Sequence, residues 1–106
     1  MTDKLVRLDL SRFTARDIRK VGELGDKMRL LHRWFRSERV DGADGQAFKV
    51  YSGDRGPRQY ASYQFSRRDD GTYRLIEGDS GEELARSRTI DGVIDALPSD
   101  FYYPER

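Results

Sequence analysis

The spacing of apolar residues changes once along this chain of 106 residues. Between Ile18 and Phe35 the apolar residues recur every three or four positions, as on one face of an α-helix. From Phe48 onward they recur at every second position over short stretches, as on one face of a β-strand. We therefore expect an α+β fold, in which a long N-terminal helix packs on an antiparallel sheet of three or four strands.

A capping signal predicts where the long helix begins. Thr14 is a good N-cap residue, and Asp17 follows three positions later, as in a capping box with the shorter acid. Phe13 and Ile18 have the spacing of a hydrophobic staple around the same cap. The helix is therefore expected to begin at Ala15.

The C-terminal end of this helix is expected at residues 37–40, because the loop sequence DGADGQ follows. In that frame Trp34 lies beside Leu31 on the apolar stripe, so we expect Trp34 to be buried against the sheet. Gly25 weakens the middle of the helix and can let another element approach closely.

Alternating stretches predict the strands. Residues 47–53 and 59–66 alternate between apolar and polar side chains, and a third strand and a short fourth strand follow them. A hairpin loop at residues 69–71, with Gly71 left-handed, would pair Phe65 with Leu75. A tighter two-residue turn would pair Phe65 with Ile76 instead, but the first register collects the large apolar residues on one side.

A brief helix is expected to close a single domain that spans residues 1–106, with Thr89 or Asp91 as its cap and Pro98 after its end. An extended lead at Leu5–Leu10 is expected before the first helix. Residues 99–106 are expected to form a tail, from which Phe101 folds back onto the core.

The charge of the chain is divided unevenly. Residues 1–40 contain eleven Lys and Arg against six Asp and Glu, whereas residues 41–106 contain nine against thirteen. The net charge is only +1, and no basic run exceeds two residues, so attraction between the two halves explains the asymmetry better than a nucleic-acid partner does. The charged N-terminal stretch has no signal-peptide pattern and no apolar run is long enough to span a membrane, so a cytoplasmic location is expected.

Few residues offer chemistry. The chain has no Cys, and its single His, His32, has no recognisable catalytic partner in the sequence, so we expect no enzyme, metal site or cofactor. The acidic glycine-containing stretches DGADG and GDSGEE lack the spacing of calcium or phosphate loops, and turn formation explains them.

The outer face of the predicted sheet is the main candidate surface. If the alternate residues face the helix, the outward side chains are basic and aromatic and form a face free of acids. The residues proposed there for binding are Lys49, Tyr51, Tyr60, Arg74, Arg86 and Arg88.

Two functions remain open from the sequence. The first is a small non-enzymatic binding or regulatory domain that acts through a protein partner or as a homodimer, because Leu30, Phe35, Tyr102 and Tyr103 are more apolar surface than one small core covers. The alternative is a nucleic-acid-binding module, in which outer tyrosines stack on bases and arginines contact phosphates.

Overall fold

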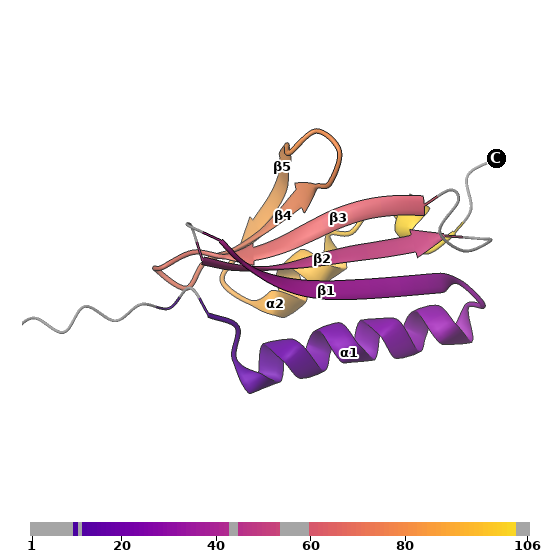
Figure 1. Ribbon diagram of the computed structural model, residues 1–106, viewed down its shortest axis with the longest axis horizontal. Coiled ribbons are helices and arrows are strands. Elements are labelled where there is room, and N and C mark those ends of the chain that lie inside the picture. Colours follow the sequence, from indigo (N-terminus) through magenta and orange to yellow (C-terminus); the bar gives the residue numbers. More distant parts are fainter. Residues whose placement is uncertain (1–9, 11, 43–44, 54–59, 104–106) are drawn as a thin grey trace, which may run out of the picture.

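The computed structural model describes residues 10, 12–42, 45–53 and 60–103 and confirms an α+β fold (Figure 1). The sheet has five antiparallel strands in the order β1-β2-β3-β4-β5, one more than the upper expectation. The elements are α1 (Ala15–Leu30), β1 (Trp34–Gly42), β2 (Gly45–Gly53), β3 (Tyr60–Arg67), β4 (Tyr73–Glu77), β5 (Glu83–Ser87), α2 (Ile90–Asp95) and the 3₁₀-helix η1 (Ser99–Phe101). The expected lead at Leu5–Leu10 lies outside the described residues except for Leu10.

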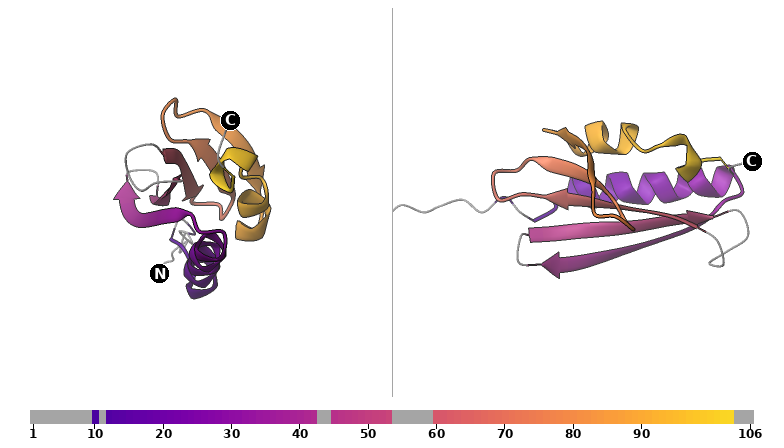
Figure 2. Two further views of the ribbon diagram at one scale, coloured as in Figure 1. Left: turned by 90° about the vertical axis from the view of Figure 1, so that its right-hand side faces the viewer. Right: turned by 90° about the horizontal axis from the view of Figure 1, so that it is seen from above.

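Both α-helices lie on the same side of the curved sheet, as the end-on view in Figure 2 shows. α1 runs along the β1 and β2 side, and α2 lies against β4 and β5. The opposite face of the sheet, which we call the outer face, is covered by no described helix. None of the described helices is long and apolar enough to cross a membrane.

The predicted start of α1 is confirmed. The Thr14 hydroxyl accepts a hydrogen bond from the Asp17 amide, and the Asp17 carboxylate accepts one from the Thr14 amide, which completes the capping box. Ile18 is 39% exposed, so the buried stripe of the helix begins at Val21 and continues through Leu24.

The predicted end of α1 is wrong, because the helix stops at Leu30 and not at residues 37–40. His32 has a left-handed φ of 57°, and its amide donates to the Arg29 carbonyl. The Arg33 amide donates to the Met28 carbonyl at 2.9 Å. These two bonds form a Schellman motif, in which a His occupies the position that Gly usually takes.

This early ending converts the remainder of the predicted helix into strand β1. Trp34 therefore begins a strand and points to the outer face, so the expectation that it is buried against the sheet is wrong. Phe35 faces inward instead, where its ring meets the ring of Phe101 edge-on at 6.2 Å between centroids. A Cβ at Gly25 would lie 3.1 Å from the Phe35 ring, so Gly25 does allow a close approach to the helix.

The preferred hairpin register between β3 and β4 is confirmed. Phe65 pairs with Leu75, Arg67 pairs with Tyr73, and Gly71 in the turn has a φ of 86°. A register shift in β4, between Leu75 and Ile76, distorts its pairing with β5.

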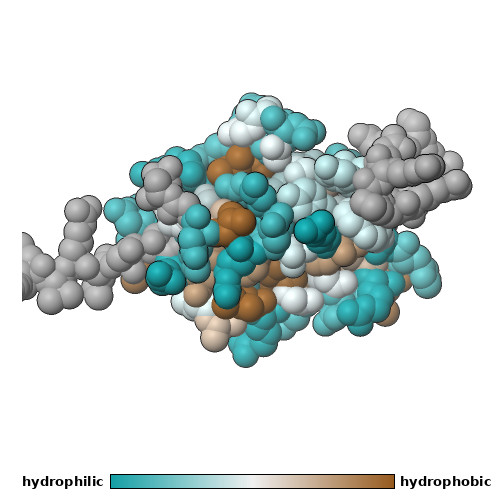
Figure 3. All heavy atoms as spheres, in the orientation of Figure 1, coloured by the Kyte–Doolittle hydropathy of each residue, from teal (hydrophilic) through white to brown (hydrophobic). Residues whose placement is uncertain are grey.

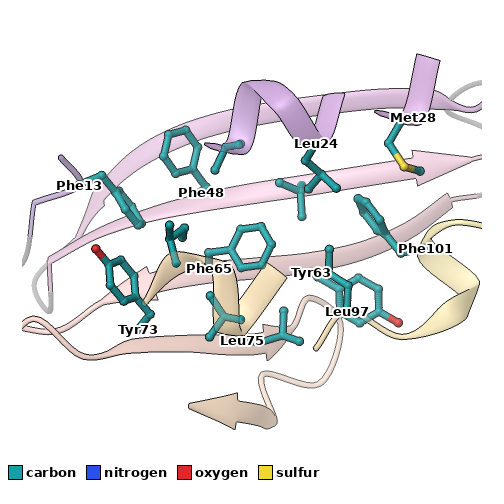
Figure 4. Close-up of a cluster of buried hydrophobic side chains, with 14 residues drawn as sticks. Phe13, Leu24, Met28, Phe48, Tyr63, Phe65, Tyr73, Leu75, Leu97 and Phe101 are labelled. Carbon is teal, nitrogen blue, oxygen red and sulfur yellow. The ribbon is translucent and has the colours of Figure 1, made fainter. Parts of the chain in front are cut away.

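The core lies between the sheet and the helices (Figure 4). Its centre contains apolar side chains of α1, the inner face of the sheet, α2 and η1. The core side chains labelled in Figure 4 are Phe13, Leu24, Met28, Phe48, Tyr63, Phe65, Tyr73, Leu75, Leu97 and Phe101.

The C-terminal segment is fastened to this core. Of the two residues expected as the cap of α2, Thr89 is the N-cap, and its side chain accepts from the Gly92 amide. Phe101 folds back and is fully buried, which was also expected. Buried Arg33 donates to the Asp100 carbonyl at 3.0 Å, so the turn after α1 is linked directly to η1.

Candidate binding surface

The outer face of the sheet carries the side chains that the alternation predicted. Lys49 and Tyr51 on β2, Tyr60 on β3 and Arg74 on β4 alternate with the buried inner positions of their strands. Figure 3 shows the molecule in the orientation of Figure 1, with apolar patches interrupted by hydrophilic side chains. The same view includes α1 below the sheet, so these apolar patches are not those of the outer face alone.

Three aromatic side chains from three neighbouring strands gather at one end of the outer face. The centroids of the Trp34 and Tyr60 rings are 6.2 Å apart, and those of Tyr51 and Tyr60 are 5.4 Å apart in an edge-on arrangement. We call Trp34, Tyr51 and Tyr60 the aromatic cluster. Trp34 and Tyr51 are half-buried, whereas Tyr60 is 51% exposed.

A glycine makes this cluster geometrically feasible. Gly53 on β2 pairs with Trp34 on one side and with Tyr60 on the other. Neighbouring strands are about 4.8 Å apart, so Trp34 and Tyr60 belong to strands separated by about twice that distance. Because Gly53 has no side chain between them, the two rings can lean toward each other across β2.

Charged residues of both signs border the aromatic cluster. Arg36 pairs with Tyr51 across β1 and β2, and Glu38 pairs with Lys49. The Tyr51 hydroxyl donates to the Glu38 carboxylate at 3.5 Å. Partial burial raises the pKa of Tyr51, and the neighbouring Glu38 carboxylate raises it further.

A second charged group lies on β4 and β5. The Glu83 carboxylate accepts from Arg86 at 3.1 Å and from Arg74 at 3.5 Å. The hydrogen bond from Arg86 is the main cause of a lowered pKa of Glu83. The expectation of an outer face without acids is therefore wrong, because Glu38 and Glu83 both lie on it.

The structure separates the predicted binding residues into two groups. Lys49, Tyr51 and Tyr60 belong to the region of the aromatic cluster. Arg74 and Arg86 pair with each other across β4 and β5. Arg74 also pairs with Ser66, six residues or about 20 Å along β3 from Tyr60.

Arg88 belongs to neither group. It follows the last residue of β5 and is exposed in the turn that leads to the α2 cap. Trp34, Arg36 and Glu38 are the outer-face residues that sequence reasoning missed, because it placed them on a helix. The stretch WFRSERV shows no alternation of apolar and polar residues that would mark a strand, and its apolar residues fit helical spacing.

The residues considered for catalysis are not assembled into a constellation. His32 is exposed in the turn after α1, where its backbone conformation ends the helix. Among the described residues, no group of three or more His, Cys, Asp or Glu side chains is arranged to hold a metal ion.

Comparison with protein-family models, with curated proteins and with solved structures found no match for this chain.

Proposed function

We propose that the chain is a non-enzymatic binding domain whose outer face contacts a protein partner through the aromatic cluster. The observation that carries this proposal is the gathering of Trp34, Tyr51 and Tyr60 on a sheet face that no described helix covers. Trp, Tyr and Arg are enriched among the residues that dominate protein–protein binding energy. The neighbouring Arg36 and Lys49 add polar contacts at the rim of such an interface.

The distribution of charge favours a protein over a nucleic acid. Glu83 engages both Arg74 and Arg86, and Glu38 lies opposite Lys49. A phosphate chain on this face would have to displace or approach those carboxylates. Surfaces that bind phosphates through charge usually present cations without nearby acids, since neutralisation of phosphates provides most of the affinity.

A peptide-display selection tests the proposal. The wild-type protein would be used to enrich peptides from a random library, and the affinity of each enriched peptide would be measured. We expect Tyr60→Ser and Trp34→Ser to weaken binding, because these substitutions remove the large aromatic contacts. Tyr103→Ser is the matched control, since Tyr103 is also an exposed tyrosine but lies outside the sheet.

Two results would contradict this function. One is a selection that yields no peptide with saturable binding. The other is a set of peptides whose affinity is unchanged by both cluster substitutions. The proposal includes a cytoplasmic location, which fractionation of cells that express the chain would test.

Nucleic-acid binding is the second candidate, because exposed tyrosines on a sheet can stack on unpaired bases. Titration of labelled single- and double-stranded oligonucleotides at low salt tests it. In this alternative Arg74→Glu weakens binding without unfolding the domain, and affinity falls steeply as salt rises. Saturable oligonucleotide binding that is lost with Tyr60→Ser would replace the protein partner as the function of this face.

A further inference from the structure

The two edge strands of the sheet differ in length and regularity. β5 has five residues and a distorted register with β4, whereas β1 has nine residues that pair with β2 without a shift. Short or irregular border strands resist further pairing, while a long regular strand presents unpaired amide and carbonyl groups to another chain. β1 is therefore the edge strand to which a further strand can be added.

The free edge of β1 is accessible in the middle of the strand. Four consecutive residues, 36–39, are exposed, although they alternate between the two faces of the sheet. Figure 2 shows β1 along the outer border of the molecule, with α1 set back behind the sheet and no described element beyond the strand. An incoming strand would meet no helix or loop among the described residues.

The charges of β1 are complementary to a second copy of the same strand. We propose that β1 pairs antiparallel with β1 of another molecule, around a two-fold axis at Ser37. This register places Arg36 of each chain opposite Glu38 of the other on the outer face. Opposite charges facing each other across two antiparallel strands are stabilising, whereas like charges are destabilising.

Registers that keep both outer faces on one side but move the axis to a neighbouring charged residue lack this complementarity. Moving the axis to Arg36 or Arg39 would place an arginine opposite its own copy, and moving it to Glu38 would place two glutamates face to face. The axis at Ser37 instead places a small neutral side chain at the centre. An axis at Val40 would also bring opposite charges together, Arg39 opposite Asp41, but only residues 38–42 of β1 would then overlap, against residues 34–40 around Ser37. Charge and the length of the overlap together favour the axis at Ser37.

The Glu38 carboxylate is held only weakly within its own chain, so it can pair with an arginine of a second chain. Its hydrogen bond from Tyr51 is long, at 3.5 Å, and lies at the exposed surface. On the inner face the same register places Phe35 of each chain opposite Arg39 of the other, where the apolar stem of the arginine can cover the half-buried ring. The paired sheets would carry both aromatic clusters on a common outer face.

This inference does not rest on the proposed function, because it uses the border of β1 and not the aromatic cluster. It is tested by sedimentation equilibrium of the full chain over a concentration series. Arg36→Glu gives each strand two acids at the paired positions, and Glu38→Arg gives it two arginines. We expect either variant alone to weaken self-association at least about tenfold, because both interchain pairs become repulsive.

Mixing these two variants provides the decisive measurement. An equimolar mixture is expected to form a heterodimer, since each acidic strand then faces a basic one. The charge-swapped variant Arg36→Glu/Glu38→Arg should self-associate as the wild type does. Arg19→Glu is the matched control, because it makes the same change of charge on the exposed side of α1 and should leave association unchanged.

The proposal is overturned if the wild type is strictly monomeric over the whole series. It is also overturned if the mixture of single variants associates no better than each variant alone. Melting curves of all variants identify any that fail to fold, and recovery in the mixture cannot come from an unfolded chain.

Discussion

The hydroxyl of Tyr73 on β4 donates a 2.6 Å hydrogen bond to the carboxylate of Asp17 in the first turn of α1. The same carboxylate accepts from the Thr14 amide in the capping box. Both side chains are buried, so the contact joins the start of the helix to the start of β4 within the core. A buried carboxylate is stabilised by such donors, and its position is fixed by them.

This contact predicts a loss of stability at alkaline pH. Burial, together with the adjoining Asp17 carboxylate, raises the pKa of Tyr73 to about 12. The tyrosine of the unfolded chain ionises near its ordinary pKa of about 10. The stabilisation linked to neutral Tyr73 is therefore complete below about pH 10 and is lost as the pH rises towards about 12.

Urea unfolding at a series of pH values measures this effect. The free energy of unfolding of Tyr73→Phe should fall less steeply above about pH 10 than that of the wild type. Tyr103→Phe, at an exposed position, should keep the wild-type slope. Tyr51 and Tyr102 also have raised pKa values, so some dependence remains in every variant. Equal slopes for wild type and Tyr73→Phe would contradict the assignment.

The cap itself predicts a second stability effect. Thr14→Ala removes the hydroxyl that accepts from the Asp17 amide, so we expect the protein to lose about 0.5–2 kcal/mol of stability. Thr14→Ser keeps an acceptor at this position and should retain most of it. Chemical denaturation compares the three proteins, and an alanine variant as stable as the wild type would show that the cap contributes nothing.

The sequence predicted elements whose signals are local. The capping box at Thr14 and the glycine turn at Gly71 each need only a few neighbouring residues, and both were found where they were expected. The register of β3 and β4 followed from the Gly71 turn and the alternation of apolar residues, because a one-residue slip would turn the apolar residues outward.

The end of α1 and the strand β1 could not be predicted in the same way. His32 adopts a left-handed backbone conformation that usually requires Gly, so the stop signal was not visible. Leu31, Trp34 and Phe35 fit helical spacing as well as a turn followed by a strand. The choice between them depends on contacts distant in the chain, such as Phe35 against Phe101.

The candidate surface was consequently only half predicted. Tyr51 and Tyr60 were assigned to the outer face correctly, because β2 and β3 were recognised. Trp34 and Glu38 were missed with β1, and they change both the aromatic and the charge character of the face.

Two glycines of α1 are expected to respond differently to the same substitution. A Cβ at Gly22 meets nothing within 4 Å, so Gly22→Ala should stabilise the protein by about 0.5–1 kcal/mol through helix propensity. At Gly25 the added Cβ would lie 3.1 Å from the Phe35 ring. We therefore expect Gly25→Ala to give a smaller gain or a loss.

Thermal unfolding of both variants measures the difference. In a Phe35→Leu background the smaller side chain relieves the contact. Gly25→Ala should therefore be more favourable there, relative to Phe35→Leu alone, than it is in the wild type. Equal stabilisation by Gly22→Ala and Gly25→Ala would show that Phe35 yields freely.

The position of Trp34 on the outer face predicts a modest role in stability. Trp34→Ala removes cross-strand contacts with Tyr60 and should cost about 1 kcal/mol or less. Phe65→Ala truncates a fully buried core side chain and should cost about 3–5 kcal/mol. Denaturant unfolding of the two variants compares them, and a Trp34→Ala loss as large as that of Phe65→Ala would place the indole in the core.

The last prediction concerns Arg33, whose side chain is only 9% exposed. One terminal nitrogen of its guanidinium donates to the Asp100 carbonyl at 3.0 Å and to the Phe101 carbonyl at 3.4 Å. Ser52 donates to the Phe101 carbonyl as well, at 2.7 Å. Arg33→Met keeps a long apolar side chain but removes the donors, so the Asp100 carbonyl loses this partner and stability should fall by about 1–3 kcal/mol.

Amide hydrogen exchange shows where that loss occurs. The amides of Phe101 and Tyr102, which bond within the η1 turn, should exchange faster in Arg33→Met, while those of β3 exchange at a rate set by global stability. Arg19→Met changes an exposed arginine of α1 and should stay within about 0.5 kcal/mol of the wild type. Unchanged protection of η1 in Arg33→Met would mean that Ser52 and the packing of Phe101 hold the segment without the arginine.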